Sequence, residues 1–140
     1  MIYFCLPFLA WGISGTLKFL INTLRARSLY GGKRLIGYGG FPSTHTATFS
    51  SVVFFAGLRL GFDSPVFTLG LGALLILIMD AHNLRRKVGA QARVLNRLQR
   101  IIDPEHVEPL RERMGHSFVE IAGGLAVGFD VAYGAQYLCL

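Results

Sequence analysis

The sequence has little charge and little cysteine. Charged residues make up 16% of the 140 positions, against about 25% in a typical soluble domain. Cys5 and Cys139 stand near opposite ends of the chain and match no metal-binding spacing, which argues against a disulfide framework and against a cysteine-ligated metal. A chain of this length is expected to form one domain, covering residues 1–140.

Apolar residues are abundant instead. Hydrophobic residues account for 52% of the chain. A soluble domain of about 150 residues buries only about 70% of its unfolded surface, so a chain this short and this apolar is not expected to be an aqueous monomer. The same composition excludes intrinsic disorder. It predicts an integral membrane protein.

Four stretches predict membrane-spanning helices, because a span needs about 20 mostly apolar residues. They cover residues 2–24, 42–62, 65–80 and 116–140. Lys18 lies near the end of the first stretch, where a long side chain can reach the membrane surface. Glu120 and Asp130 make the fourth stretch the most polar. The predicted fold is an all-α polytopic membrane protein of about four spans.

The segment between the third and fourth spans, residues 83–115, combines apolar and basic side chains. Its apolar residues recur at helical spacing: Leu84, Val88, Ala92, Leu95, Leu98 and Ile102. Arginines and Lys87 occupy the positions between them. This pattern predicts a basic amphipathic helix at the membrane interface, ended by Asp103 and Pro104.

The basic residues are unevenly distributed. Of the fourteen lysines and arginines, four lie in residues 25–34 and eight in residues 85–113. In a polar protein a net charge of +6 would suggest nucleic acid, but basic clusters between long apolar stretches are typical of a membrane protein, and no nucleic-acid partner is expected. The positive-inside rule places both clusters in the cytoplasm. The polar residues expected near that face are Lys18, Arg25, His45, Asp80, Arg85, Arg86, His116 and Glu120.

Residues 39–45, Gly-Gly-Phe-Pro-Ser-Thr-His, read as a helix start that could hold an anion. Gly40 gives the backbone freedom, Pro42 presets the first turn, and Ser43 with Thr44 can cap the helix. Unpaired N–H groups at a helix start attract phosphate, and His45 would point toward it. The simpler alternative is an ordinary capped helix.

A second motif, residues 115–120, contains His116 and Glu120 four positions apart. Residues i and i+4 share a helix face, so the carboxylate can orient one imidazole nitrogen and leave the other facing a substrate. Two alternatives stay open. The pair could join two spans by hydrogen bonding, or the two histidines and an acid could bind zinc.

A third motif ends the third span. Asp80 at membrane depth marks a functional group or a specific partner, and it could fix Arg85 or Arg86 for a forked contact with phosphate. The two arginines could instead serve only to set the topology. His82 and His106 are expected to be interfacial polar residues.

These motifs together resemble a known superfamily, the type 2 phosphatidic acid phosphatases and vanadium haloperoxidases. Residues 42–45 resemble its P-S-G-H motif, His116 and Glu120 its H-x-x-x-D, and Lys18 with Arg25 its K-x-x-x-x-x-x-R. The chain looks most like the divergent branch of small membrane proteins. The pattern of that branch, G-G-x-P-S-[ST]-H, D-A-x-x-x-R-R-x-x-G-x-Q-A-x-x-L-N and G-H-x-x-x-E, matches residues 39–45, 80–96 and 115–120.

The resemblance implies hydrolysis of a phosphomonoester or pyrophosphate through a phosphohistidine, with no metal or cofactor. His116 would be the nucleophile, Glu120 its orienting partner and His45 the general acid. The expected phosphate-binding residues are Lys18, Ser43, Thr44, Arg85, Arg86 and Arg111, supported by Asp80, Gly40 and Arg25.

Several positions depart from the superfamily pattern. Ala26 replaces a proline and Thr44 a glycine, and Glu120 lengthens the orienting arm by one methylene. Leu110 stands where the superfamily has its arginine six residues before the nucleophile, and Arg111 is one position off that register. The resemblance therefore does not decide which arginine grips phosphate.

The sequence thus predicts a lipid-phosphate phosphatase, with the bilayer and a membrane lipid phosphate as partners. Gly124 and Gly128 form a G-x-x-x-G face suited to close helix contact, and a homo-oligomer is a further hypothesis. The main alternative is a non-catalytic binder or carrier of lipid phosphates. A vanadate site and a purely structural membrane protein are the others.

Overall fold

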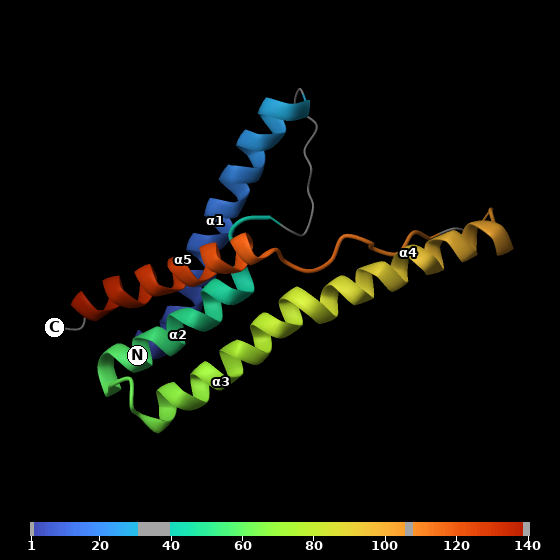
Figure 1. Cartoon of the computed structure of the whole chain (residues 1–140). Helices are drawn as coiled ribbons and strands as arrows, with labels where there is room; N and C mark the ends of the chain where they lie inside the picture. Colours follow the sequence, from blue (N-terminus) through green and yellow to red (C-terminus); the bar gives the residue numbers. More distant parts are fainter. Residues whose placement is uncertain (1, 31–39, 106–107, 139–140) are drawn as a thin grey trace.

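The computed structural model describes residues 2–30, 40–105 and 108–138, with the side chains of residues 25–30 left out. The helices are α1 (Ile2–Tyr30), α2 (Thr44–Leu60), α3 (Pro65–Met79), α4 (Arg85–Ile102) and α5 (Phe118–Tyr137), and a π-helical turn, η1 (Asp80–Leu84), joins α3 to α4 (Figure 1). The described residues contain no strand. The all-α prediction is therefore confirmed.

Helix α2 is the centre of the fold, because α1, α3 and α5 all pack against it. Its contact with α5 is the most extensive and depends on small residues. A Cβ added to Gly124 would lie 2.8 Å from Cβ of Thr46, and one added to Gly128 would overlap the Ser50 side chain. The G-x-x-x-G face thus packs on α2 within the chain and is not available for contact with a second copy. The homo-oligomer stays a prediction, and this face does not support it.

Within the described part of the chain, three helical stretches are long and apolar enough to cross a membrane: Ile2–Leu24, Pro65–Ile102 and Phe118–Tyr137. The second predicted span is a helix too, but α2 has 17 residues, fewer than the roughly 20 of a usual span. Its inner position explains this composition, since its buried hydroxyls, Ser50 and Ser51, bond to backbone carbonyls of the preceding turn. The chain is a polytopic all-α membrane protein.

The predicted amphipathic helix is α4, and it continues directly from α3 instead of following a loop. Pro65–Ile102 forms one helical rod of 38 residues, interrupted only by η1 (Figure 1). The chain then runs back beside α4 as an irregular segment, residues 108–117, called here the return segment (Figure 1). The buried residues of α4 are Gly89, Ala92 and Asn96, while most of the predicted apolar stripe, including Leu95 and Ile102, is exposed.

Candidate active site

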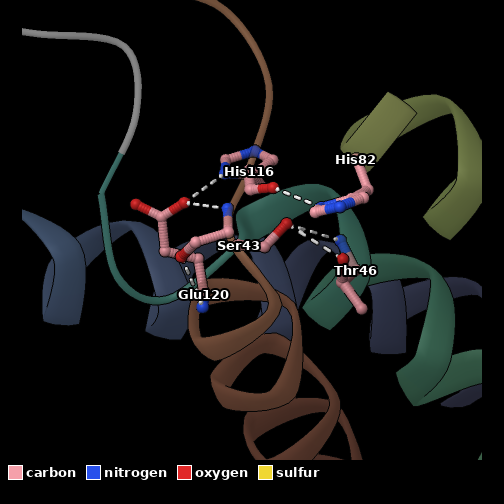
Figure 2. A network of polar contacts seen from close by, with 6 residues as sticks. Ser43, Thr46, His82, His116 and Glu120 are labelled. Carbon is pink, nitrogen blue, oxygen red and sulfur yellow. Dashed lines mark hydrogen bonds and ion pairs between the residues drawn. The ribbon is translucent and has the colours of Figure 1, made fainter. Parts of the chain in front are cut away.

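The start of α2 is fixed by its cap and by α5. Ser43 is the N-cap, its Oγ accepting hydrogen bonds from the backbone N–H of Thr46 at 3.4 Å and from the Thr46 hydroxyl at 2.9 Å (Figure 2). The Ser43 N–H donates to the Glu120 carbonyl at 2.8 Å. Pro42 precedes the cap, so it does not occupy the first helical turn as predicted. This arrangement brings His45, one residue into α2, next to the start of α5.

The Glu120 carboxylate is held by a capping box at the start of α5. Its Oε2 accepts a hydrogen bond from the Ser117 N–H at 2.8 Å, and the Ser117 hydroxyl accepts one from the Glu120 N–H at 3.3 Å. The same Oε2 lies 3.4 Å from Nδ1 of His116. Glutamate at the third helical position is the residue that completes a capping box. The extra methylene, relative to the superfamily's aspartate, therefore has a structural use here.

His116 is fixed from two sides. Its N–H donates to the Ala81 carbonyl of η1 at 2.9 Å, and its carbonyl lies 3.1 Å from Nδ1 of His82 (Figure 2). Gly115 has φ +91°, and a Cβ there would lie 2.6 Å from Cγ of Arg86, so only glycine allows this close approach. The side chain of His116 is 9% exposed. Both its backbone and its ring are thereby oriented.

His82 has a role that sequence reasoning missed. It was expected to be an interfacial polar residue, but it contacts the His116 backbone and its ring packs on Phe118 with centroids 4.0 Å apart. A position in the π turn makes this possible. In η1 the Arg85 N–H bonds the Asp80 carbonyl five residues back, and such wider turns often occur at functional sites. No pattern in the sequence predicted the π turn.

The two predicted catalytic histidines face one another. The ring centroids of His45 and His116 are 6.2 Å apart, with the planes inclined at 54°. His45 is exposed, whereas His116 is buried. Two residues 71 positions apart in the sequence thus meet at one end of the helix bundle. Nδ1 of His116 points to Glu120, which leaves Nε2 as the nitrogen available to a ligand.

Both histidines line a cavity of about 620 Å³. Its lining residues are Trp11, Lys18, Thr44, His45, Thr48, Phe49, Leu77, Arg85, Arg111, Met114, Gly115 and His116. Three of these are cations, contributed by α1, α4 and the return segment. Nε of Arg85 donates to Oδ2 of Asp80 at 2.9 Å, so Asp80 orients this guanidinium as the sequence suggested. Electrostatically, the cavity suits an anion.

Arg111 reaches the cavity because Asn96 pins the return segment to α4. The Asn96 amide is almost completely buried; it accepts from the Leu110 N–H at 2.7 Å and donates to the Leu110 carbonyl and to Oε1 of Glu112, each at 2.8 Å. The hydrogen bond from Asn96 lowers the pKa of Glu112, and Arg93 at 3.5 Å adds to the effect. With the Leu110 backbone held in this way, its neighbour Arg111 lines the site. Arg111, one position off the superfamily register, is therefore, among the described residues, one of the two arginines that line the cavity.

Burial lowers the pKa of His116, which lies just outside α5. The Glu120 carboxylate opposes the shift, because a negative charge favours the imidazolium, and Lys18 reinforces it. The net direction favours neutral imidazole near pH 7. Neutral imidazole is the form that can act as a nucleophile.

Comparison of the sequence with known families shows which family the chain belongs to. The sequence model described as "Divergent PAP2 family" matches residues 2–131. The chain belongs to this family. It is also 30% identical over 102 residues to the "Uncharacterized membrane protein YuiD" of Bacillus subtilis (strain 168), a match that covers 62% of this chain and 65% of that relative. The chain thus spans somewhat less than two thirds of the relative's length. No solved structure matches.

Membership of the Divergent PAP2 family makes the chain a phosphatase-related integral membrane protein. Several residues predicted for its site stand elsewhere. The Ser43 side chain is fully buried as the helix cap and does not line the cavity. Arg86 is exposed and does not line it either. Gly40, with φ +121°, packs against the Asn22 side chain and shapes the entry to α2.

Other predicted positions of this Divergent PAP2 chain fall outside the described residues. They are Gly39, His106, Cys139, residues 31–34 of the basic cluster, and the side chains of residues 25–30, which include Arg25. Among the residues that the structure does describe, no group of three or more histidine, cysteine, aspartate or glutamate side chains is placed to hold a metal ion.

Proposed function

We propose that this protein is a lipid-phosphate phosphatase that hydrolyses a phosphomonoester or pyrophosphate headgroup through a phosphohistidine. The observation that carries the proposal is the pair of imidazoles, His45 and His116, 6.2 Å apart in a cavity also lined by Lys18, Arg85 and Arg111. Family membership supports a phosphatase-related chemistry. Phosphoryl transfer requires mainly positioning and positive charge around the equatorial oxygens, and this cavity offers both.

In the first step, Nε2 of His116 attacks phosphorus. The bond from phosphorus to the leaving oxygen breaks as the nitrogen–phosphorus bond forms, and His45 donates a proton to the leaving alkoxide. Glu120 holds Nδ1 of His116 and stabilises the positive charge that develops on the ring. Lys18, Arg85 and Arg111 balance the charge on the phosphoryl oxygens. Thr44 lines the cavity at the start of α2, so the positive end of the α2 dipole also favours the negative phosphoryl oxygens.

In the second step, water attacks the phosphohistidine. His45, left neutral by the first step, accepts a proton from that water, and the nitrogen–phosphorus bond breaks to release inorganic phosphate. His116 returns to its neutral form and His45 to its protonated form, so no net change remains on the protein. The phosphoryl group stays at one position during both steps, because both imidazole rings are held in place.

The position of the site favours a lipid substrate. Lys18 lies in an apolar stretch long enough to span a membrane, Ile2–Leu24. His45 lies at the start of α2 and His116 just before the start of α5. A phosphate could occupy the headgroup zone while its hydrocarbon remains in the bilayer. The rival function is binding or transport of a lipid phosphate without cleavage, which the same basic cavity would also perform.

One experiment separates catalysis from binding. Purified protein in detergent is incubated with a panel of lipid phosphates, with and without EDTA, and released inorganic phosphate is measured. We expect release that EDTA does not reduce, and a loss of at least about 1,000-fold in His116→Ala with retained lipid-phosphate binding. In a second comparison, Lys18→Ala should weaken binding of the lipid phosphate. Lys87→Ala is the control and should not weaken it, because Lys87 is an exposed α4 residue outside the cavity. No release by the wild-type protein, with tight binding, would favour a carrier.

We further propose that the active face is cytoplasmic, on the positive-inside rule. Cys5 is exposed, so the test starts from a variant in which both native cysteines are serine. A single cysteine is placed at Arg59, in the last turn of α2, or at Ser64, the N-cap of α3, and treated with an impermeant thiol reagent. Labelling on intact cells supports this orientation, whereas labelling only after lysis reverses it.

A further inference from the structure

The cavity changes from polar to apolar in one direction on each of its helical walls. On α1, Trp11 lies seven residues from Lys18, toward the N-terminal end of the helix. On α2, His45 is followed by Phe49, and on the α3–α4 rod Arg85 is preceded by Leu77. At 1.5 Å per residue these separations are about 10, 6 and 12 Å. Each of three helices therefore contributes one apolar side chain to the cavity, about 6–12 Å along its own axis from its polar lining residue.

The apolar part of the cavity is not closed by helix packing. Among the described residues, α1 and α3 each pack against α2 but scarcely touch each other, and they diverge in Figure 1. The cavity nevertheless takes residues from both. Trp11 is 64% exposed, and the Ile2–Leu24 stretch is mostly unburied by protein. The flank between α1 and α3 thus faces the surroundings of the bundle, which in a membrane are lipid chains.

We propose that Trp11, Phe49 and Leu77 form a binding subsite for the first part of a substrate's hydrocarbon chain, entered sideways from the bilayer between α1 and α3. The inference rests on the proposed function, since it assigns the phosphate to the cations and the chain to these three apolar side chains. The expected substrate is an amphiphile with a phosphate at one end and a hydrocarbon chain at least about 10 Å long. A small water-soluble phosphate would fill only the polar end.

The subsite makes recognition of the hydrocarbon chain depend on a few apolar side chains, of which Trp11 is exposed and Phe49 and Leu77 are half-buried. Trp11 offers the largest apolar surface of the three, and in a membrane, where lipid chains are as apolar as the side chain itself, it stabilises a bound chain through packing contacts. We expect the loss of these contacts to weaken binding roughly tenfold. Because Trp11 lies about 10 Å from Lys18 along the helix, its removal acts on the chain and not on the phosphate.

The first test compares Trp11→Ala with Phe8→Ala in detergent. Phe8 is 62% exposed on the same helix and lies outside the cavity, so it is a matched control. The substrates are hexadecyl phosphate and phenyl phosphate. We expect the ratio of their kcat/KM values to fall about tenfold in Trp11→Ala, mainly through KM for hexadecyl phosphate, and to stay at the wild-type value in Phe8→Ala. An unchanged ratio in Trp11→Ala overturns the subsite.

The second test does not require turnover. A long-chain alkyl phosphate carrying a diazirine about 10 Å from phosphorus is photolysed with the wild-type protein in lipid nanodiscs, and labelled peptides are identified by mass spectrometry. We expect labelling at Trp11, Phe49 or Leu77, reduced by unlabelled hexadecyl phosphate. Labelling spread evenly over lipid-facing residues such as Phe8 and Leu75 overturns the subsite. If this labelling is specific but no substrate is cleaved, the subsite stands and the phosphatase proposal fails.

Discussion

Two regions of the molecule hold the candidate site by different means. The packed half, formed by α1, α2 and α5, buries eight residues of α2 and six of α5. The arm, formed by α3, η1 and α4, buries fewer residues: Leu74 in α3, Ala81 in η1, and Gly89, Ala92 and Asn96 in α4. Its α3 packs on α2, whereas hydrogen bonds join η1 and α4 to the return segment and to His116. Close packing of small residues positions His45 and Glu120, whereas a few polar contacts position Arg85 and Arg111. Within one small chain, rigid and adjustable parts therefore meet around the same cavity.

His116 stands where the two regions join. Its backbone is bonded to the arm, through Ala81 and His82, while its ring is bonded to Glu120 of the packed half. A change in either region therefore alters the position of the His116 imidazole, but through different atoms. Variants in the packed half should reduce the amount of folded protein, and variants in the arm should reduce activity with the fold retained.

The largest expected effect is on the packed half. Gly128→Leu places a side chain where the Ser50 hydroxyl and the Ser51 N–H already lie, and overpacking of this kind costs about 3 kcal/mol. We expect a strong loss of thermal stability in detergent. Gly134→Leu in the same helix and Gly72→Leu in the arm are the controls, because no atom lies within 4 Å of a Cβ at either site. Equal stability of all three variants would contradict the packing described above.

The next effect concerns the arm. Asn96→Ala removes three hydrogen bonds to the return segment, so Arg111 and the backbone that leads to His116 lose their support. We expect kcat/KM to fall roughly 30-fold, by analogy with displaced catalytic groups, with the melting temperature of the bundle nearly unchanged. Gln91→Ala, an exposed amide on the same helix, should behave like the wild type. A fall in stability with normal specific activity would show that Asn96 serves the fold alone.

A smaller effect is expected at Asp80. Asp80→Asn weakens the hold on the Arg85 guanidinium, whose forked contact with phosphate depends on its orientation. Inhibition by inorganic phosphate should weaken by roughly tenfold, while Asp63→Asn, in the exposed turn before α3, should leave it unchanged. If Arg85→Ala and Asp80→Asn had additive effects on phosphate inhibition, the two residues would not act as a pair.

The smallest effect is a shift of the pH profile. The nucleophile must be neutral, and burial lowers the pKa of His116, so kcat/KM should hold its value below pH 6.5 before it falls with further acid. Glu120→Gln removes a charge that raises the pKa of His116, so the acid limb should move to still lower pH. A limb that moves to higher pH in this variant would contradict the assignment.

Local patterns in the sequence predicted much of this structure. The Ser43 cap, the pair of Asp80 and Arg85, and the i, i+4 contact of His116 with Glu120 are all short-range, so spacing was enough to find them. The family resemblance added that His45 and His116 would meet. The roles of His82 and Asn96 could not be foreseen, because each depends on the return segment lying against the α3–α4 rod. The choice among the arginines depends on that same long-range contact.

The π turn also sets the rotational phase between the two halves of the long rod. A π turn is equivalent to one residue inserted in an α-helix, and each residue of an α-helix advances the direction of its side chains by about 100°. Deleting one residue from Asp80–Leu84 would therefore swing every later position of α4 through more than a quarter of a circle. Gly89, Ala92 and Asn96 would then no longer face the return segment, and the Arg85 guanidinium would no longer line the cavity.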